Sequence, residues 1–241
     1  MKQQDFENAI ALLIQEDWVK PTVDLIAADM QMNAGHDLGH LLRVLRNARR
    51  IADGEIARGE AVDWKVVAAA ALLHDVVDLP KDHPDRSSAS RQSSEKAAAH
   101  FRALGAFDEA KIERIFHAIE AHSFSAGIEA RSIEAKIVCD ADRLESVGAF
   151  GIARVFQVSG QLGGGICDMA DPFAEHRELD DVRYTVDHFY SKMLKLTARL
   201  YTPTGRAIGG QRHRFMETYL AQLADEIGVP VREDAAEPVS S

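Results

Sequence analysis

Apolar residues recur along most of this chain at the three- and four-residue spacing that is typical of amphipathic α-helices. In the first part of the chain they predict helices from residue 6 to about 17, from Pro21 onward, and through 41–51. Later segments with the same spacing predict helices over about 94–104, 108–121, 131–146, 148–159, 181–201 and 205–227. Strand signals are scarce, and the β-rich stretch at 137–139 lies inside a helical pattern. The sequence therefore predicts an all-α fold.

One predicted helix, at 64–77, is apolar nearly all round, which indicates a central helix buried on every side, with Asp63 as its candidate N-cap. The polar stretch at 80–94 contains prolines, serines and alternating charges, and it predicts a long loop of the kind that often carries function. The glycines at 163–165 predict a mobile turn, and 229–241 a flexible C-terminal tail. Because we find no repeat and no linker in residues 1–228, we expect them to form one helical domain.

The charge balance narrows the classes of partner. The 241 residues include 28 Lys and Arg against 38 Asp and Glu, which gives a formal net charge of -10. A protein that binds duplex nucleic acid needs an excess of basic residues to displace counterions from phosphates, and this excess is absent. An acidic protein can still hold a small basic pocket, so a nucleotide-sized anionic substrate remains compatible with the composition.

The chain has the features of a cytoplasmic protein. Its two cysteines, Cys139 and Cys167, form no CxxC pair, and the N-terminus has no signal-peptide pattern. The longest apolar run, at 66–73, is far shorter than the ~20 residues that span a bilayer. We therefore expect a cytoplasmic protein without a membrane partner, and we interpret both thiols as packing residues.

Two segments carry candidate metal-binding residues. The dipeptide His74-Asp75 ends the most apolar predicted helix, where unpaired polar groups are costly, and imidazole with carboxylate is a good ligand pair for divalent manganese, iron or zinc. Upstream, His36 and His40 stand four residues apart with Arg43 on the same helix face. The alternatives are a histidine–aspartate pair satisfied by the backbone, and a solvated helix start.

A third segment offers two aspartates. Asp140 and Asp142 are two residues apart, about 200° around a helix, so they cannot both face one centre. One of them should be a ligand and the other a surface or capping group. Periodicity does not choose between them.

In their order along the chain, His40, His74-Asp75 and Asp142 resemble the HD superfamily of metal-dependent phosphohydrolases, and most closely the bacterial branch that includes YedJ and YpgQ. The resemblance spans roughly residues 33 to 210. Further segments that look like this branch are His122-Ser123-Phe124-Ser125, Glu134-Ala135-Lys136-Ile137-Val138, Asp140-Ala141-Asp142-Arg143-Leu144, Gly151-Ile152-Ala153-Arg154-Val155-Phe156, His188-Phe189-Tyr190 and Lys192-Met193-Leu194-Lys195-Leu196.

The resemblance implies an HD-type helical bundle with a buried metal site. It assigns His40 as the first ligand, because this histidine precedes Val44 by four positions, and Asp142 as the last, because it stands before an Arg-Leu pair. His74 and Asp75 complete the set. The implied cofactor is a divalent ion, manganese in preference, with magnesium, iron, cobalt or nickel as alternatives.

The resemblance also suggests roles for His36 and Asp78, whereas the cations among the candidate substrate contacts are chosen from their positions in the sequence. His36 is a candidate general acid, with support of a ligand or capping of the helix as the alternative. Asp78 is a candidate base for the attacking water, with a plain helix-end carboxylate as its alternative. Candidate substrate contacts are Lys81, Arg86, Arg43 and His122, the last also being a candidate ligand of a second metal. For the loop cations the alternative is a solvated loop.

The predicted reaction is therefore metal-assisted hydrolysis of a small phosphate ester or anhydride. Within this branch, the resemblance implies nucleoside triphosphates as candidate substrates, cleaved to monophosphate and pyrophosphate. Two other functions stay open: a di-iron oxygenase on the same fold, which needs more metal-binding histidines, and a catalytically silent ligand-binding or regulatory module. A homo-oligomer also stays open.

Overall fold

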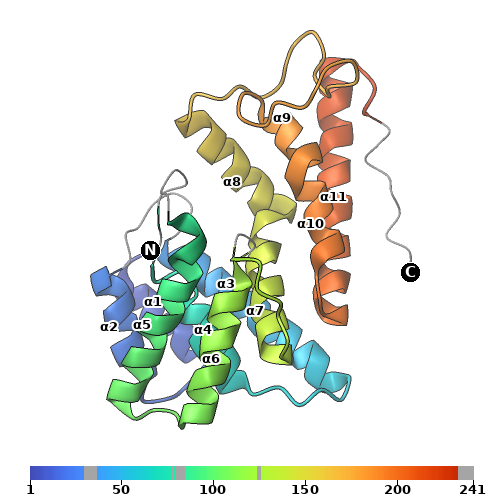
Figure 1. Ribbon diagram of the computed structural model, residues 1–241. Helices are drawn as coiled ribbons and strands as arrows, with labels where there is room; N and C mark the ends of the chain where they lie inside the picture. Colours follow the sequence, from blue (N-terminus) through green and yellow to red (C-terminus); the bar gives the residue numbers. More distant parts are fainter. Residues whose placement is uncertain (30–36, 78, 80–84, 124–125, 233–241) are drawn as a thin grey trace. The chain divides into compact units, whose positions relative to one another are not determined.

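The computed structural model describes residues 1–29, 37–77, 79, 85–123 and 126–232, and in this part of the chain it consists of helices and their connections (Figure 1). The all-α class expected from the sequence is confirmed. Among the described residues, β structure is limited to an isolated bridge between Gly165 and Tyr184. None of the described helices combines the length and the apolar character that crossing a membrane requires.

The chain divides into two compact units. Unit 1 is formed by 1–142 together with Tyr201–Thr204, and unit 2 by 143–200 together with 205–241. The single domain expected for residues 1–228 stays a prediction. Unit 1 contains the helices α1 (Gln3–Ala11), α2 (Val19–Asp29), α3 (Leu38–Ala57), α4 (Trp64–Leu73), the short 3₁₀ helix η1 (Arg86–Ser88), α5 (Ala89–Leu104), α6 (Glu109–His122) and nearly all of α7 (Ile133–Arg143).

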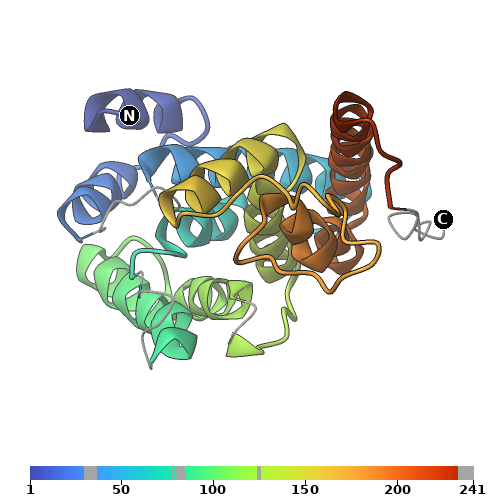
Figure 2. The ribbon, with the colours of Figure 1, turned by 90° about the horizontal axis from the view of Figure 1, so that it is seen from above.

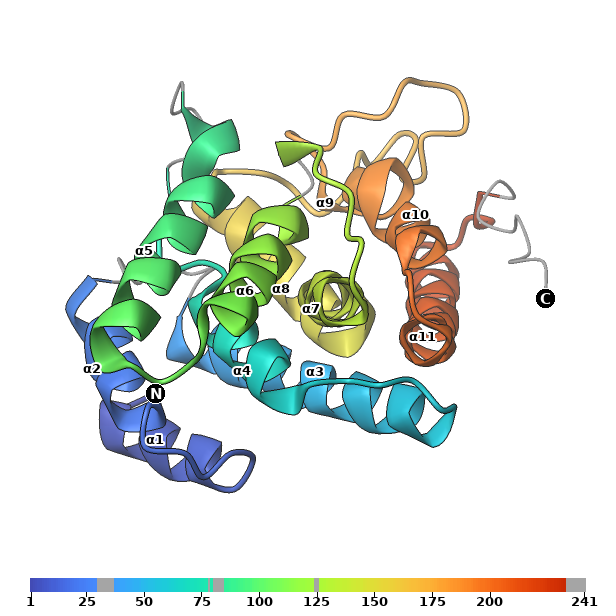
Figure 3. The same ribbon diagram turned by 60° about the horizontal axis from the view of Figure 1, so that its bottom comes forward.

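Helix α4 is the centre of unit 1. Every residue from Val66 to Leu73 is buried, as the uninterrupted apolar run predicts. The helix packs against α3 and α6, and α6 packs in turn against α5 (Figures 2 and 3). Asp63 caps its start by accepting a hydrogen bond of 3.1 Å from the Lys65 amide. The α-helix ends at Leu73, not near residue 77, so His74 and Asp75 follow directly on the buried core.

Two further predicted boundaries in unit 1 are wrong. The first helix ends at Ala11, because a turn there leaves Leu12 exposed and brings Ile14 inside. The predicted loop at 80–94 is helical from residue 86 on. Three of the serines that suggested a loop, Ser90, Ser93 and Ser94, are buried in α5, and backbone groups satisfy the hydroxyls of the last two. Ser94 donates to the Ser90 carbonyl at 2.7 Å, for example, and Ser93 Oγ accepts from the Val77 amide at 3.1 Å.

Unit 2 contains the remaining helical segments. They are the 3₁₀ helix η3 (Leu144–Ser146), α8 (Gly148–Gln161), α9 (Thr185–His188), the π-helix η4 (Phe189–Met193), α10 (Leu194–Leu196), the 3₁₀ helix η5 (Thr197–Arg199) and nearly all of α11 (Pro203–Ile227). The helix expected over 181–201 thus begins at Thr185 and changes its winding along its length. Phe189 is fully buried in unit 2 and stacks on Tyr219, with 5.9 Å between ring centroids.

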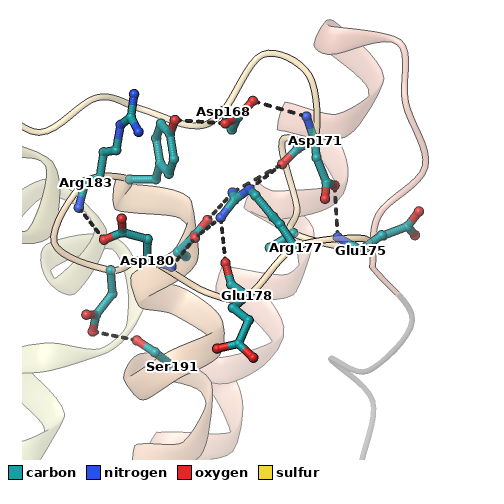
Figure 4. Close-up of polar contacts among 12 residues, drawn as sticks. Asp168, Asp171, Glu175, Arg177, Glu178, Asp180, Arg183 and Ser191 are labelled. Carbon is teal, nitrogen blue, oxygen red and sulfur yellow. Dashed lines mark hydrogen bonds and ion pairs between the residues drawn. The ribbon is translucent and has the colours of Figure 1, made fainter.

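The long loop between α8 and α9 is held by a buried ion pair (Figure 4). The Asp187 carboxylate is completely buried, and it accepts hydrogen bonds from the Arg177 guanidinium and from the Asp180 amide. The Tyr184 hydroxyl also donates to Asp168 at 2.8 Å. A buried carboxylate is tolerated because its partners supply charge and hydrogen bonds together.

Candidate metal centre

His74 follows the central helix of unit 1 with one ring nitrogen bound to the backbone. Its side chain has no exposed surface, and Nδ1 lies 2.9 Å from the Ala71 carbonyl oxygen. A carbonyl oxygen only accepts, so Nδ1 carries the hydrogen and Nε2 holds the lone pair. An imidazole fixed in this tautomer is ready to bind a metal ion through Nε2.

His40 reaches the same place from the first turn of α3. Asp37 caps that helix by accepting a hydrogen bond of 2.7 Å from the His40 amide, which fixes where the turn begins. The His40 side chain is buried, so a solvated helix start is excluded for it. Its Nε2 lies 3.3 Å from His74 Nε2, and two helices therefore direct imidazole nitrogens at one point.

Two carboxylates face these imidazoles. Asp75 Oδ2 lies 3.4 Å from His74 Nε2 and 3.7 Å from His40 Nε2. Asp142 Oδ1, from the end of α7, lies 3.8 Å and 3.7 Å from the same two nitrogens. The structure therefore brings together all four residues that the sequence predicted as ligands.

Asp140, the other aspartate of this segment, has a different role. Its carboxylate is fully buried in unit 1 and accepts hydrogen bonds from the Tyr201 amide at 2.8 Å, the Thr202 amide at 2.8 Å and the Thr202 hydroxyl at 2.7 Å. Asp140 thus holds the chain that leads into α11. Asp142 is the aspartate on the side of the imidazoles, a choice that periodicity left open.

His122, at the end of α6, adds a fifth group to the cluster. Its Nε2 lies 3.2 Å from Asp75 Oδ1, and its Nδ1 lies 2.6 Å from the Ile119 carbonyl oxygen, the same backbone arrangement that His74 has. The imidazoles of His74 and His122 meet edge to face, with 4.9 Å between centroids. The sequence predicts a site role for His122, but its contact with Asp75 joins positions far apart in the chain and has no local signal.

Burial and charge set the protonation states of the cluster. Burial lowers the pKa of His74 to about 4, so this imidazole is neutral at pH 7. Burial alone would raise the pKa of Asp75, but the neighbouring His74, together with the hydrogen bonds of His122 and His40, holds it well below its usual range. For His122, burial lowers the pKa, and the hydrogen bond and charge of Asp75 outweigh this and raise it.

The donor set fits a divalent transition-metal ion. Imidazole and carboxylate ligands lie at about 2.0–2.2 Å from such an ion, so neighbouring ligand atoms stand roughly 3.0–3.6 Å apart. The separations in the cluster run from 3.3 to 3.8 Å around the two Nε2 atoms. Among the described residues, the ligand atoms of two groups all lie within 4.8 Å of one another: one group of His40, His74 and Asp142, the other of His74, Asp75 and His122.

The remaining predicted site residues either lie outside the described part of the chain or have described contacts elsewhere in unit 1. His36, Asp78 and Lys81 lie outside the described residues. Arg86 donates to the Leu79 carbonyl. Arg43 folds back over the start of α3, where a Cβ at Gly39 would come within 3.0 Å of its Nη1. The substrate-binding roles of Arg43 and Arg86 stay predictions.

The sequence of this chain matches a known protein family. The family model of the HD domain matches residues 37–147, a span that contains all five clustered residues. The protein YpgQ of Bacillus subtilis (strain 168) is 32% identical over 219 residues, which cover 89% of this chain and 95% of that protein.

Solved structures agree with this match. The crystal structure of Bacillus subtilis YpgQ in complex with ADP has a TM-score of 0.63 at 31% identity, and the match covers 86% of this chain and 97% of that one. An HD-superfamily hydrolase from Bacillus thuringiensis has a TM-score of 0.66 at 27% identity, covering 95% of this chain and all of its own (100%). A protein from Lactobacillus plantarum has a TM-score of 0.64 at 31% identity, covering 88% and 98%.

Proposed function

Because this chain belongs to the HD domain family, we propose that it is a metal-dependent phosphohydrolase that acts on a small phosphate ester or anhydride. The observation that carries the proposal is the convergence of the imidazoles of His40 and His74 with the Asp142 carboxylate in the interior of unit 1. With Asp75, these residues would hold one divalent ion. Manganese is our first choice, and magnesium, iron, cobalt and nickel are the alternatives.

When bound, the ion would supply a Lewis acid that polarises a phosphoryl oxygen and a water molecule. Side chains of the protein would then transfer protons and neutralise negative charge. Asp78 would accept the proton of the attacking water, and His36 would protonate the leaving oxygen. The phosphate oxygens would be contacted by four further side chains, which would neutralise the charge that develops during attack. These are His122, Arg43, Lys81 and Arg86.

A nucleotide is the substrate class that we favour. YpgQ of Bacillus subtilis has been crystallised in complex with ADP, and its sequence is similar to this chain over most of both lengths. A nucleoside triphosphate would be cleaved to monophosphate and pyrophosphate. The net charge of -10 argues against a long nucleic acid as substrate but not against a single nucleotide.

A substrate screen tests the proposal. The protein is loaded in turn with manganese, magnesium, iron, cobalt and nickel and is offered nucleotides and simple phosphoesters, while phosphate and pyrophosphate release are measured separately. We expect turnover of at least one nucleotide, and its loss in His74→Ala. A protein that binds stoichiometric metal but turns over none of the panel would be a silent binding module instead.

One observation favours a second candidate function, a di-iron oxygenase. Asp75 faces His74 through one oxygen and His122 through the other, at 3.4 and 3.2 Å, which is an arrangement that a bridging carboxylate needs. Iron content decides between the two functions. Two irons per chain and oxygen consumption would support the oxygenase, whereas a single ion with phosphate or pyrophosphate release would exclude it.

A further inference from the structure

A second cluster of ionisable groups lies in unit 2, around one oxygen of Asp181. Ser191 Oγ donates to Asp181 Oδ2 at 2.8 Å, and the Lys192 ammonium and His188 Nδ1 lie 3.0 and 3.2 Å from the same oxygen. Figure 4 draws the Ser191 contact beside the loop that Arg177 holds. In the sequence, His188 and Lys192 stand out only as parts of a resemblance, and Asp181 does not stand out at all.

The backbone explains why three donors reach one carboxylate. Phe189–Met193 forms a π-helix, whose wider turn changes the angles between successive side chains. His188 directly precedes this turn, while Ser191 and Lys192 belong to it. Single π-turns are rare and occur frequently at functional sites. The winding is therefore a second feature, independent of the charges, that sets this segment apart.

Asp181 fixes the orientation of the groups around it. Burial raises the pKa of Asp181, but the hydrogen bonds from Ser191 and Lys192 outweigh burial and lower it, so the carboxylate is ionised at neutral pH. Because His188 Nδ1 faces that carboxylate, this nitrogen carries the hydrogen and Nε2 points to the opposite side of the ring. The His188 side chain is 28% exposed and the Lys192 side chain 61%, so a ligand can reach both.

The helical segment that carries His188 and Lys192 is rich in basic residues. Residues 188–216 contain six Lys and Arg and no Asp or Glu, whereas the whole chain has a net charge of -10. The rest of the chain therefore carries -10 minus +6, a formal charge of -16. Lys192, Lys195, Arg199 and Arg206 are exposed. This segment therefore offers cations to an anion, although the loop before it, 168–187, contains seven Asp and Glu against two Arg.

We propose that His188 and Lys192, positioned by Asp181, form a phosphate-binding site in unit 2 whose ligand is a small polyphosphate anion such as pyrophosphate. The Lys192 ammonium donates to phosphate oxygens. His188 Nε2 accepts from a P–OH group when the ring is neutral and donates to an ionised oxygen when it is protonated. The site goes beyond the proposed function, because it needs neither metal nor hydrolysis.

Calorimetric titration of the full chain with inorganic pyrophosphate, in EDTA and at low salt, tests the site. We expect binding by the wild-type protein and at least a tenfold weakening in Lys192→Ala and in His188→Ala. Lys195→Ala is the matched control, since it removes an exposed lysine three residues away. It should weaken binding by less than about twofold, because a diffuse surface charge is worth little. Circular dichroism confirms that each variant is folded.

Asp181 is tested as a positioning residue. Asp181→Asn should weaken pyrophosphate binding while leaving the fold intact, and Asp181→Glu should restore part of the affinity, a rescue that a purely structural role would not give. An NMR titration should show the His188 ring responding to pyrophosphate in the wild-type protein but less in Asp181→Asn.

Further titrations distinguish the ligand's source and the outcomes that overturn the site. If Lys192→Ala weakens the binding of pyrophosphate and of ADP to the same extent, the site recognises a phosphate chain, either free or as part of a nucleotide. Binding of ADP without any binding of pyrophosphate overturns the proposal. So does absence of pyrophosphate binding at millimolar concentration, or an equal loss in Lys192→Ala and Lys195→Ala. Turnover by metal-loaded protein is measured separately and decides only the proposed hydrolase.

Discussion

At the residue scale, protonation of His74 couples the metal centre to the stability of the fold. Burial lowers the pKa of this imidazole from 6.5 to about 4. Between these two pH values the unfolded chain binds a proton that the folded protein excludes, so stability decreases as the pH falls through this range. We expect the melting temperature of metal-free protein to fall between pH 7 and pH 4, as measured by calorimetry.

His74→Asn provides the control for this pH dependence, because an amide does not titrate. The variant should melt at a lower temperature at pH 7 but lose less stability on acidification. Burial also lowers the pKa of His100 and His117, so the slope should shrink without vanishing. Parallel pH profiles for the two proteins would show that His74 does not carry the effect.

Substitutions of Asp140 and Asp142 should have different effects, the first on folding stability and the second on metal binding. Asp140 is buried and accepts three hydrogen bonds from Tyr201 and Thr202, so Asp140→Ala should reduce the free energy of unfolding by about 3 kcal/mol. Asp142 is partly exposed and faces the imidazoles. Asp142→Ala should leave the metal-free protein nearly as stable as the wild type and remove most of its metal. Urea unfolding and elemental analysis measure the two effects, and metal loss confined to Asp140→Ala would reverse the assignment.

At the scale of helices, two glycines of α8 differ in the space that an added Cβ atom would have. A Cβ at Gly151 would come within 2.5 Å of the Ser146 backbone, which cannot move aside as a side chain can. Gly151→Ala should therefore destabilise the protein by about 2 kcal/mol. Gly160 lies in the same helix, and a Cβ added there would meet no atom within 4 Å. Gly160→Ala should therefore stabilise the protein by about 0.5–1 kcal/mol.

Thermal unfolding measures both glycine variants. For a chain of this size, each kcal/mol corresponds to a shift of roughly 2–4 °C in melting temperature. Gly151→Ala should melt several degrees below the wild type and Gly160→Ala slightly above it. Similar shifts in both variants would mean that helix propensity, and not the contact with Ser146, governs this helix.

The helices also show where sequence reasoning succeeds and where it stops. Periodicity identified α4 because burial on all sides leaves an uninterrupted apolar run, and it placed His74 at the end of that helix. It missed the start of α5, because a serine that hydrogen-bonds inside a helix cannot be told from a loop serine without its partner. The same limit applies to Asp140, whose partners Tyr201 and Thr202 are distant in the sequence.

At the scale of the whole molecule, net charge should govern how fast a polyanionic substrate is captured. The formal charge of -10 creates a field that repels a triphosphate at long range. Such a field extends over about 30 Å at 0.01 M salt but only about 8 Å at 0.15 M. The local cations act over shorter distances and are screened less. Added salt should therefore remove the repulsion before it weakens the contacts that bind the substrate.

We accordingly expect kcat/KM for the best nucleoside triphosphate to rise by a factor of a few between about 0.01 and 0.15 M salt, while kcat stays nearly constant, because capture and not chemistry is affected. A singly charged phosphodiester serves as the control substrate, and its kcat/KM should change little over the same range. Steady-state kinetics at fixed metal concentration measure both. A fall in kcat/KM with salt would show that cations of the protein attract the substrate more strongly than the net charge repels it.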